Sequence, residues 1–144
     1  MEGIDYDETF APVTRYSPIR SILALSTQMG WNINQTNVKT TFINGFIEEE
    51  VYIEHPIGFE TLDRESNVCR LKRALYGLKQ APHAWYTKIN NYFTELGFTK
   101  SEADANLYHI LVDGKVFTIL IYVDDMILTR DEQLIKYFID DLAR

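Results

Sequence analysis

The 144-residue chain lacks several features that would place it quickly in a structural class. Its one cysteine, Cys69, excludes an internal disulfide and a zinc site built from several cysteines. Its longest apolar run, near residues 116–123, is far too short to span a bilayer. Residues 1–20 lack the basic and then apolar order of a signal peptide. We therefore expect no membrane partner.

Acidic residues are missing from one long stretch, although the net charge of the chain is −7. Between residues 66 and 94 there is no Asp or Glu, and aromatic side chains alternate with cations. The cations are Arg70, Lys72, Arg73, Lys79 and Lys88. This composition is typical of a surface that contacts a nucleic-acid backbone, but also of an ordinary helix face in water. The composition leaves both interpretations open, and the net charge argues against the first.

The spacing of apolar and turn residues predicts an α+β fold in a single domain over residues 1–144. Helices are expected over 18–29, with Ser17 as the N-cap, over 80–97 and over 132–143. Mostly antiparallel strands are expected over 31–38, 48–56, 67–72, 106–112, 115–123 and 126–129. Asp113-Gly114, between two apolar runs, is a strong hairpin signal.

Two adjacent aspartates, Asp124 and Asp125, interrupt the apolar run IYVDDMIL at residues 121–128. Unpaired carboxylates are costly to bury, so we expect the pair to project from a turn between two strands. Adjacent carboxylates suit divalent cations, and two-metal phosphoryl transfer places such ions about 3.5–4 Å apart. Asp-Asp pairs are also common in plain turns, and a metal site would need a further oxygen ligand from another strand.

Longer stretches of the chain resemble the reverse transcriptase domain of copia-type long-terminal-repeat retrotransposons. The matching stretches are DYDETFAPVTRY, QTNVKTTFINGFIEEEVYIEHPIGFE, CRLKRALYGLKQAPHAWY, GFTKSEADANLY and IYVDDMILT. The resemblance implies an RNA-directed DNA polymerase with two magnesium ions and a right-hand polymerase palm, an antiparallel sheet backed by helices. It implies part of the fingers and no thumb. The implied partners are an RNA or DNA template-primer, deoxynucleoside triphosphates and the other subdomains of a polyprotein, in virus-like particles of the cytoplasm and in the nucleus.

The resemblance also implies roles for individual residues. Asp124 and Asp125 match catalytic, metal-binding carboxylates. The nucleotide-binding positions are Val38, Phe42, Tyr76, Gly77 and Lys79, and the nucleic-acid contacts are Arg70, Lys72, Arg73 and Lys88. In the family, an aromatic at the position of Phe42 packs under the nucleotide sugar and rejects a 2′-hydroxyl. The alternative is that Phe42 is simply a core residue.

The match fails at the third catalytic carboxylate, because Asn37 stands where the family has an aspartate. Asparagine keeps the shape and one carbonyl oxygen but loses the charge, so we expect weak or absent magnesium binding. Asn37 should end a strand beside the hairpin of Asp124 and Asp125. Arg130 replaces a glycine at a place where a positive φ is expected.

The chain is therefore expected to be a partial and degenerate copy that begins inside the fingers and stops before the thumb. Three interpretations stay open at this point. The chain is a catalytically impaired reverse transcriptase, a non-catalytic nucleic-acid-binding palm fold, or a retroelement relic without function.

Overall fold

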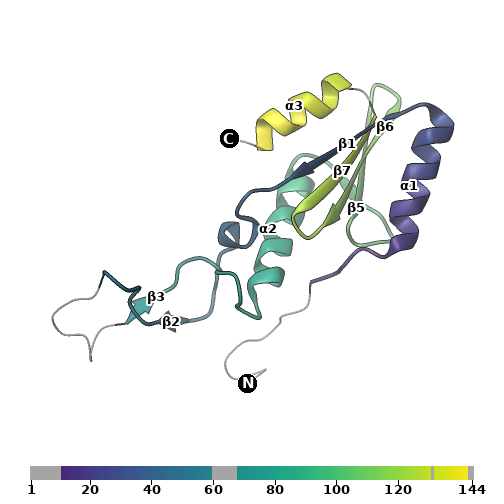
Figure 1. The fold of residues 1–144 in the computed structure, drawn as a ribbon. Helices are drawn as coiled ribbons and strands as arrows, with labels where there is room; N and C mark the ends of the chain where they lie inside the picture. Colours follow the sequence, from purple (N-terminus) through teal and green to yellow (C-terminus); the bar gives the residue numbers. More distant parts are fainter. Residues whose placement is uncertain (1–10, 60–67, 131, 143–144) are drawn as a thin grey trace. The chain divides into compact units, whose positions relative to one another are not determined.

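The computed structural model describes residues 11–59, 68–130 and 132–142 (Figure 1). The helices are α1 (Tyr16–Met29), η1 (Thr41–Asn44, a 3-10 turn), α2 (Ala81–Glu95) and α3 (Glu132–Leu142). The strands are β1 (Asn32–Asn37), β2 (Tyr52–Ile53), β3 (Cys69–Arg70), β4 (Thr99–Lys100), β5 (Leu107–Val112), β6 (Lys115–Tyr122) and β7 (Asp125–Arg130). This mixture of helices with antiparallel strands confirms the predicted α+β class.

Contacts between residues divide the chain into two compact units. The first, which we call the sheet unit, comprises Pro12–Thr41 and Ile89–Arg144. The second, the hairpin unit, comprises Phe42–Lys88 together with Met1–Ala11. Helix α2 runs through the boundary between them. The single domain expected over residues 1–144 stays a prediction.

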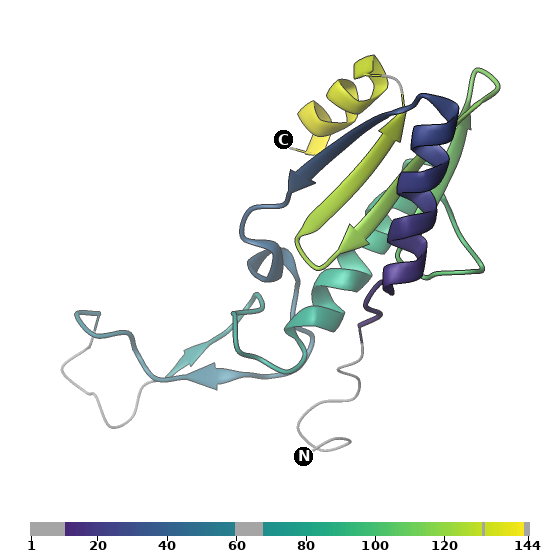
Figure 2. The same cartoon turned by 45° about the vertical axis from the view of Figure 1, so that its right-hand side comes forward.

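The sheet unit is built on a five-stranded antiparallel sheet with the strand order β1-β7-β6-β5-β4. Helix α1 covers one face of this sheet, and the C-terminal part of α2 lies on the other (Figure 2). Phe93 of α2 and Phe138 of α3 meet with ring centroids 5.8 Å apart, so α3 shares the second face. The two-residue strand β4 was missed from the sequence, because two residues carry no readable period.

Aromatic side chains form the core on the face of α2 and α3. Phe93, Phe98, Tyr108, Phe117 and Phe138 are all buried, and their ring centroids lie 4.9–5.9 Å apart in the contacting pairs. Such tilted pairs contribute roughly 0.5–1.5 kcal/mol beyond the burial of their area. The buried hydroxyl of Tyr108 donates a hydrogen bond to Asn90 Oδ1 at 3.0 Å. The one hydroxyl among these five rings therefore has a hydrogen-bond partner.

The start of α1 differs from the sequence prediction. The helix begins at Tyr16, with Arg15 as an N-cap that makes no side-chain hydrogen bond, so the prediction of Ser17 as the N-cap was wrong. Pro18 misled the prediction, because a proline is tolerated throughout the first turn, where backbone N–H groups have no helical partner anyway. The end of the helix agrees: Gly30 has φ 64° and its N–H bonds back to Ser26 O and Thr27 O.

Two expectations about backbone conformation are confirmed, one between β5 and β6 and one at the end of β7. Asp113 and Gly114 have φ values of 49° and 72° between β5 and β6, as a two-residue hairpin requires. Arg130, at the end of β7, has φ 141°, which explains why a glycine would suit this position. Its guanidinium donates to Val116 O and lies 5.5 Å from the ring centre of Trp31. These contacts offset the backbone strain that an arginine carries here.

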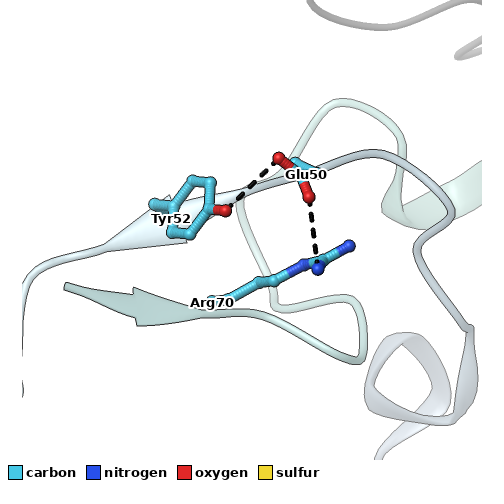
Figure 3. A network of polar contacts seen from close by, with 3 residues as sticks. All are labelled: Glu50, Tyr52 and Arg70. Carbon is cyan, nitrogen blue, oxygen red and sulfur yellow. Dashed lines mark hydrogen bonds and ion pairs between the residues drawn. The ribbon is translucent and has the colours of Figure 1, made fainter.

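The hairpin unit contains the short antiparallel pair of β2 and β3. Glu50 joins the two strands: it lies 3.2 Å from Arg70 Nη1 and accepts a hydrogen bond of 3.3 Å from the Tyr52 hydroxyl (Figure 3). Gly45 lies so close to α2 that a Cβ added there would stand 2.9 Å from the Trp85 backbone nitrogen. Within the described part of the chain, no helix is long and apolar enough to cross a membrane.

Candidate active site

The turn between β6 and β7 presents the two aspartates. Tyr122 pairs with Asp125 at the ends of the two strands, so Val123 and Asp124 form a two-residue turn. Both carboxylates are half-buried rather than enclosed. The expected turn is therefore confirmed for Asp124, whereas Asp125 is already the first residue of β7, and the flanking strands enter the core, where Met126 and Leu128 are buried.

Backbone strain is concentrated at this turn. Val123 has φ 57°, a left-handed conformation that β-branched residues adopt very rarely. Such a residue costs on the order of 1–3 kcal/mol and persists only where its surroundings enforce it. Here the enforcing elements are the β6–β7 pairing on one side and β1 on the other, since the N–H of Val38 donates to Asp124 O at 2.8 Å.

Asn37 lies where the sequence predicts it. It is the last residue of β1 and is paired with Asp125 across the sheet. Its side-chain Nδ2 donates to Asp124 Oδ2 at 3.0 Å and approaches Asp125 Oδ1 at 3.5 Å. The sheet register therefore brings Asn37, Asp124 and Asp125 together at one end of the β1-β7-β6 strands.

Gln35 is a further member of this cluster that sequence reasoning missed. Its Nε2 donates to Asp125 Oδ1 at 3.2 Å. The signal was available in the strand period, because residues two apart on a strand point to the same face. Once Asn37 is placed beside the aspartates, Gln35 must share its face.

The donor set is short of anions for two magnesium ions. In the parts of the chain that the structure describes, no group of three or more His, Cys, Asp or Glu side chains is arranged to hold a metal ion. Two carboxylates are present, and the amides beside them direct N–H groups at the carboxylate oxygens. Magnesium is held by oxygen ligands, so the residues as arranged do not fit the pair of ions that the resemblance implies. The two-magnesium prediction itself stays untested.

The segment after β1 is fixed by local hydrogen bonds. Thr41 is buried and its hydroxyl donates to Val38 O at 2.6 Å, which closes a turn that contains Thr40 at φ 56°. Val38 is half-buried at the start of this turn. Its expected role at the nucleotide stays a prediction.

In the hairpin unit, the structure brings together two of the expected nucleotide-binding residues. The rings of Phe42 and Tyr76 meet edge to face, with centroids 4.9 Å apart. Phe42 is half-buried and Tyr76 is exposed, so Tyr76 covers one side of Phe42 from the solvent. Gly77 has φ 96°, a conformation that favours glycine, and Lys79 follows in the next turn. Their contact with a nucleotide stays a prediction.

The four expected nucleic-acid contacts lie in three different surroundings. Arg70 is paired with Glu50, as described above, whereas Arg73 and Lys88 lie over the ring of Phe46, 5.6 Å and 5.4 Å from its centre. Phe46 is 60% exposed, and no spacing rule connected it to the basic stretch, because it precedes that stretch by some twenty residues of chain. Lys72 is exposed.

Comparison with known proteins assigns the chain to a family. The family model described as reverse transcriptase (RNA-dependent DNA polymerase) matches residues 1–144. The chain belongs to this family, as expected from its resemblance to copia-type reverse transcriptases. No solved structure matches the chain significantly.

The relatives named by this comparison are transposon proteins. The chain is 40% identical over 99% of its length to the retrovirus-related Pol polyprotein from transposon RE2 of Arabidopsis thaliana, of which it covers 10%. It is also 40% identical, over 99% of its length, to that from transposon TNT 1-94 of Nicotiana tabacum, covering 11%. The Gag-Pol polyprotein of transposon Ty1-H from Saccharomyces cerevisiae is 28% identical over 98% of the chain, which covers 8% of it. The chain thus spans about a tenth of the first two relatives.

Proposed function

We propose that the chain is the palm, with part of the fingers, of a transposon Pol polyprotein reverse transcriptase whose metal site is disabled by Asn37. The observation that carries this proposal is the hydrogen bond from Asn37 Nδ2 to Asp124 Oδ2, 3.0 Å long. It supports the assignment of an uncharged amide to the position where the resemblance implies a third carboxylate. The antiparallel sheet with helices on both faces supports the palm assignment.

The reaction of an intact site is template-directed nucleotidyl transfer, in which a primer hydroxyl attacks the triphosphate and pyrophosphate leaves. Two divalent cations, when bound, stabilise the attacking and leaving oxygens. Asp124 and Asp125 are the two anions that this chain retains at such a site, and with an amide at position 37 they do not suffice for a pair of ions. Loss of the third anion would reduce the stabilisation by several kcal/mol, which corresponds to several powers of ten in rate.

The nucleotide-binding roles that the resemblance implies are proposed for the residues of each unit by itself. Val38 follows β1 directly, and Phe42 with Tyr76 forms the aromatic pair of the hairpin unit. We assign Phe42 to the nucleotide sugar, and Tyr76, Gly77 and Lys79 to the segment under the template-primer and incoming nucleotide. The alternative role of Phe42 as a core residue is supported less well, because its ring is only half-buried.

The template-primer contact is assigned to the cations around Phe46. Arg73 and Lys88 lie over an exposed aromatic ring, which combines phosphate-binding charge with a stacking surface. Lys72 adds an exposed cation from the same stretch. Arg70 contributes less, because Glu50 already neutralises its charge. Further segments of a Pol polyprotein are the natural protein partners of such a module.

A second candidate function is nucleic-acid binding without catalysis. The same two observations favour it: the amide at position 37 and the exposed cation-aromatic cluster of the hairpin unit. A relic without function would retain neither binding nor catalysis. Binding to a primer-template duplex at low salt separates these two alternatives.

The proposal is tested by primer extension on an RNA template with magnesium or manganese. The unmodified chain is expected to incorporate no nucleotide above the background set by an Asp124→Asn variant. Duplex binding measured on the same preparation shows that the protein is folded and competent to bind. Incorporation above that background by the unmodified chain would contradict the proposed effect of Asn37.

A further inference from the structure

We infer that Gln35 and Asn37 form an amide clamp, which holds Asp124 and Asp125 together without any cation. The clamp is defined by three contacts, from Gln35 Nε2 to Asp125 Oδ1 and from Asn37 Nδ2 to Asp124 Oδ2 and Asp125 Oδ1. In the family's site, that task falls to divalent metal ions. The inference rests on the proposed function only for the descent of this site from a metal site.

The clamp follows from the register of the sheet. Asn37 is directly opposite Asp125, and Gln35 is opposite Ile127, one same-face position along β7. A long side chain reaches a diagonal neighbour on the same face of an antiparallel pair. Gln35 therefore reaches Asp125 at 3.2 Å, while the shorter Asn37 reaches across to the turn residue Asp124 at 3.0 Å.

The orientation of the amides follows from their chemistry. Ionised carboxylates accept hydrogen bonds and cannot donate them, so an amide beside one must present its NH₂ group. Hydrogen bonds to an ionised acceptor are about twice as strong as those between neutral groups. Asp125 Oδ1 accepts hydrogen bonds from both amides, and Asp124 Oδ2 accepts one from Asn37. Each of the two adjacent carboxylates therefore has an N–H donor.

The clamp and a cation exclude one another at these oxygens. A cation that binds Asp124 Oδ2 and Asp125 Oδ1 meets the partial positive charge of the NH₂ groups and has to turn them away. Replacing Asn37 by aspartate removes two of the three contacts and adds a third anion. The hairpin of that variant is therefore destabilised without metal and stabilised by metal, whereas the natural chain is indifferent to metal.

The test is thermal unfolding of the full 144-residue chain with EDTA and with millimolar manganese. The variants are Asn37→Asp and the control Asn91→Asp, which makes the same change at an exposed position of α2 in the sheet unit. In EDTA we expect Asn37→Asp to lower the midpoint by roughly 6 °C and Asn91→Asp to change it by less than about 2 °C. Manganese should restore the midpoint of Asn37→Asp and leave the unmodified chain and Asn91→Asp where they were.

A second variant tests Gln35 by itself. Gln35→Leu keeps the side chain long, removes its donor, and leaves Asn37 in place. We expect a midpoint lowered by about 3 °C in EDTA, with recovery in manganese smaller than that of Asn37→Asp. An unchanged midpoint for Gln35→Leu in EDTA would remove Gln35 from the clamp.

The outcomes separate the clamp from the proposed function. If manganese raises the midpoint of the unmodified chain as much as that of Asn37→Asp, the clamp is wrong, while the descent from a metal site stands. If Asn37→Asp is as stable as the unmodified chain in EDTA, the clamp is also wrong. If Asn37→Asp loses stability but does not respond to manganese, the clamp holds and the assignment of a metal site to Asp124 and Asp125 is wrong.

Discussion

Phe93 of the sheet unit and Phe46 of the hairpin unit differ strongly in the degree to which their side chains are buried. In the sheet unit, Phe93 is fully buried among four other rings, whereas Phe46 of the hairpin unit is 60% exposed beneath two cations. Exposed hydrophobic residues recur along the hairpin unit: Tyr52, Ile57, Phe59, Val68 and Tyr76. Regions with few buried apolar contacts open at low free energy, while a packed core opens only on global unfolding.

The two candidate sites are therefore stabilised by different interactions. The Asp124–Asp125 turn is held by strands whose side chains enter the core, so its geometry is fixed by the fold. The cation-aromatic cluster around Phe46 lies on a surface, where charge and exposure matter more than packing. Loss of stability should therefore follow substitutions in the first region, and loss of binding those in the second.

The largest expected effect is the loss of core packing. Phe93→Ala should lower the free energy of unfolding by about 3–5 kcal/mol, because it leaves a cavity where several rings meet. Phe46→Ala, the same truncation in the hairpin unit, should cost less than about 1 kcal/mol. Urea denaturation followed by circular dichroism measures both. Equal losses for the two variants would break the comparison.

A smaller effect of the opposite sign is expected at the strained turn. Val123→Gly should raise the free energy of unfolding by about 1 kcal/mol, since glycine adopts φ 57° without strain and little apolar surface is lost. The control is Val116→Gly, in β6 at its exposed start, which should destabilise the chain because no positive φ is relieved there. A Val123→Gly chain that is less stable than the natural one would show that the turn is not strained.

The smallest effect concerns binding in the hairpin unit. Arg73→Gln should reduce the slope of log affinity against log salt by about 1 for a primer-template duplex, because one phosphate contact is lost. The matched variant Arg70→Gln should change the slope less, since Glu50 already pairs with Arg70. Equal changes for both variants would contradict the division of the basic residues. Salt-independent binding would remove the template-primer assignment altogether.

The sequence predicted the strands in which apolar and polar residues alternate over several positions. It did not predict the features that depend on contacts between distant segments. Alternation and turn residues located β1, β5, β6 and β7, and the Asp113-Gly114 turn was found where its residues predict it. The placement of Asn37 beside Asp125 was also predicted, because the family motif fixed the register. The start of α1 was wrong because Ser17 is a strong local cap signal that the fold does not use.

The parts of the candidate sites that were missed are contacts between side chains distant in sequence. Gln35 reaches Asp125 across 90 positions of the chain, and the ring of Phe46 receives Arg73 and Lys88 from segments that follow it. The face of Gln35 could be predicted from the strand period once Asn37 was placed, but the contact of Phe46 with Arg73 and Lys88 depends on packing that no local pattern indicates. The pairing of Arg70 with Glu50 escaped for the same reason, since Glu50 lies outside the acid-free stretch.

The central claim is that the amide of Asn37 disables a metal site at Asp124 and Asp125, and direct metal titration tests it most closely. Manganese binding would be followed by paramagnetic broadening of the backbone amides of the β6–β7 turn. We expect no selective broadening in the unmodified chain, selective broadening in Asn37→Asp, and its loss in the double variant that adds Asp124→Asn. Selective broadening of equal strength in the unmodified chain would contradict the claim.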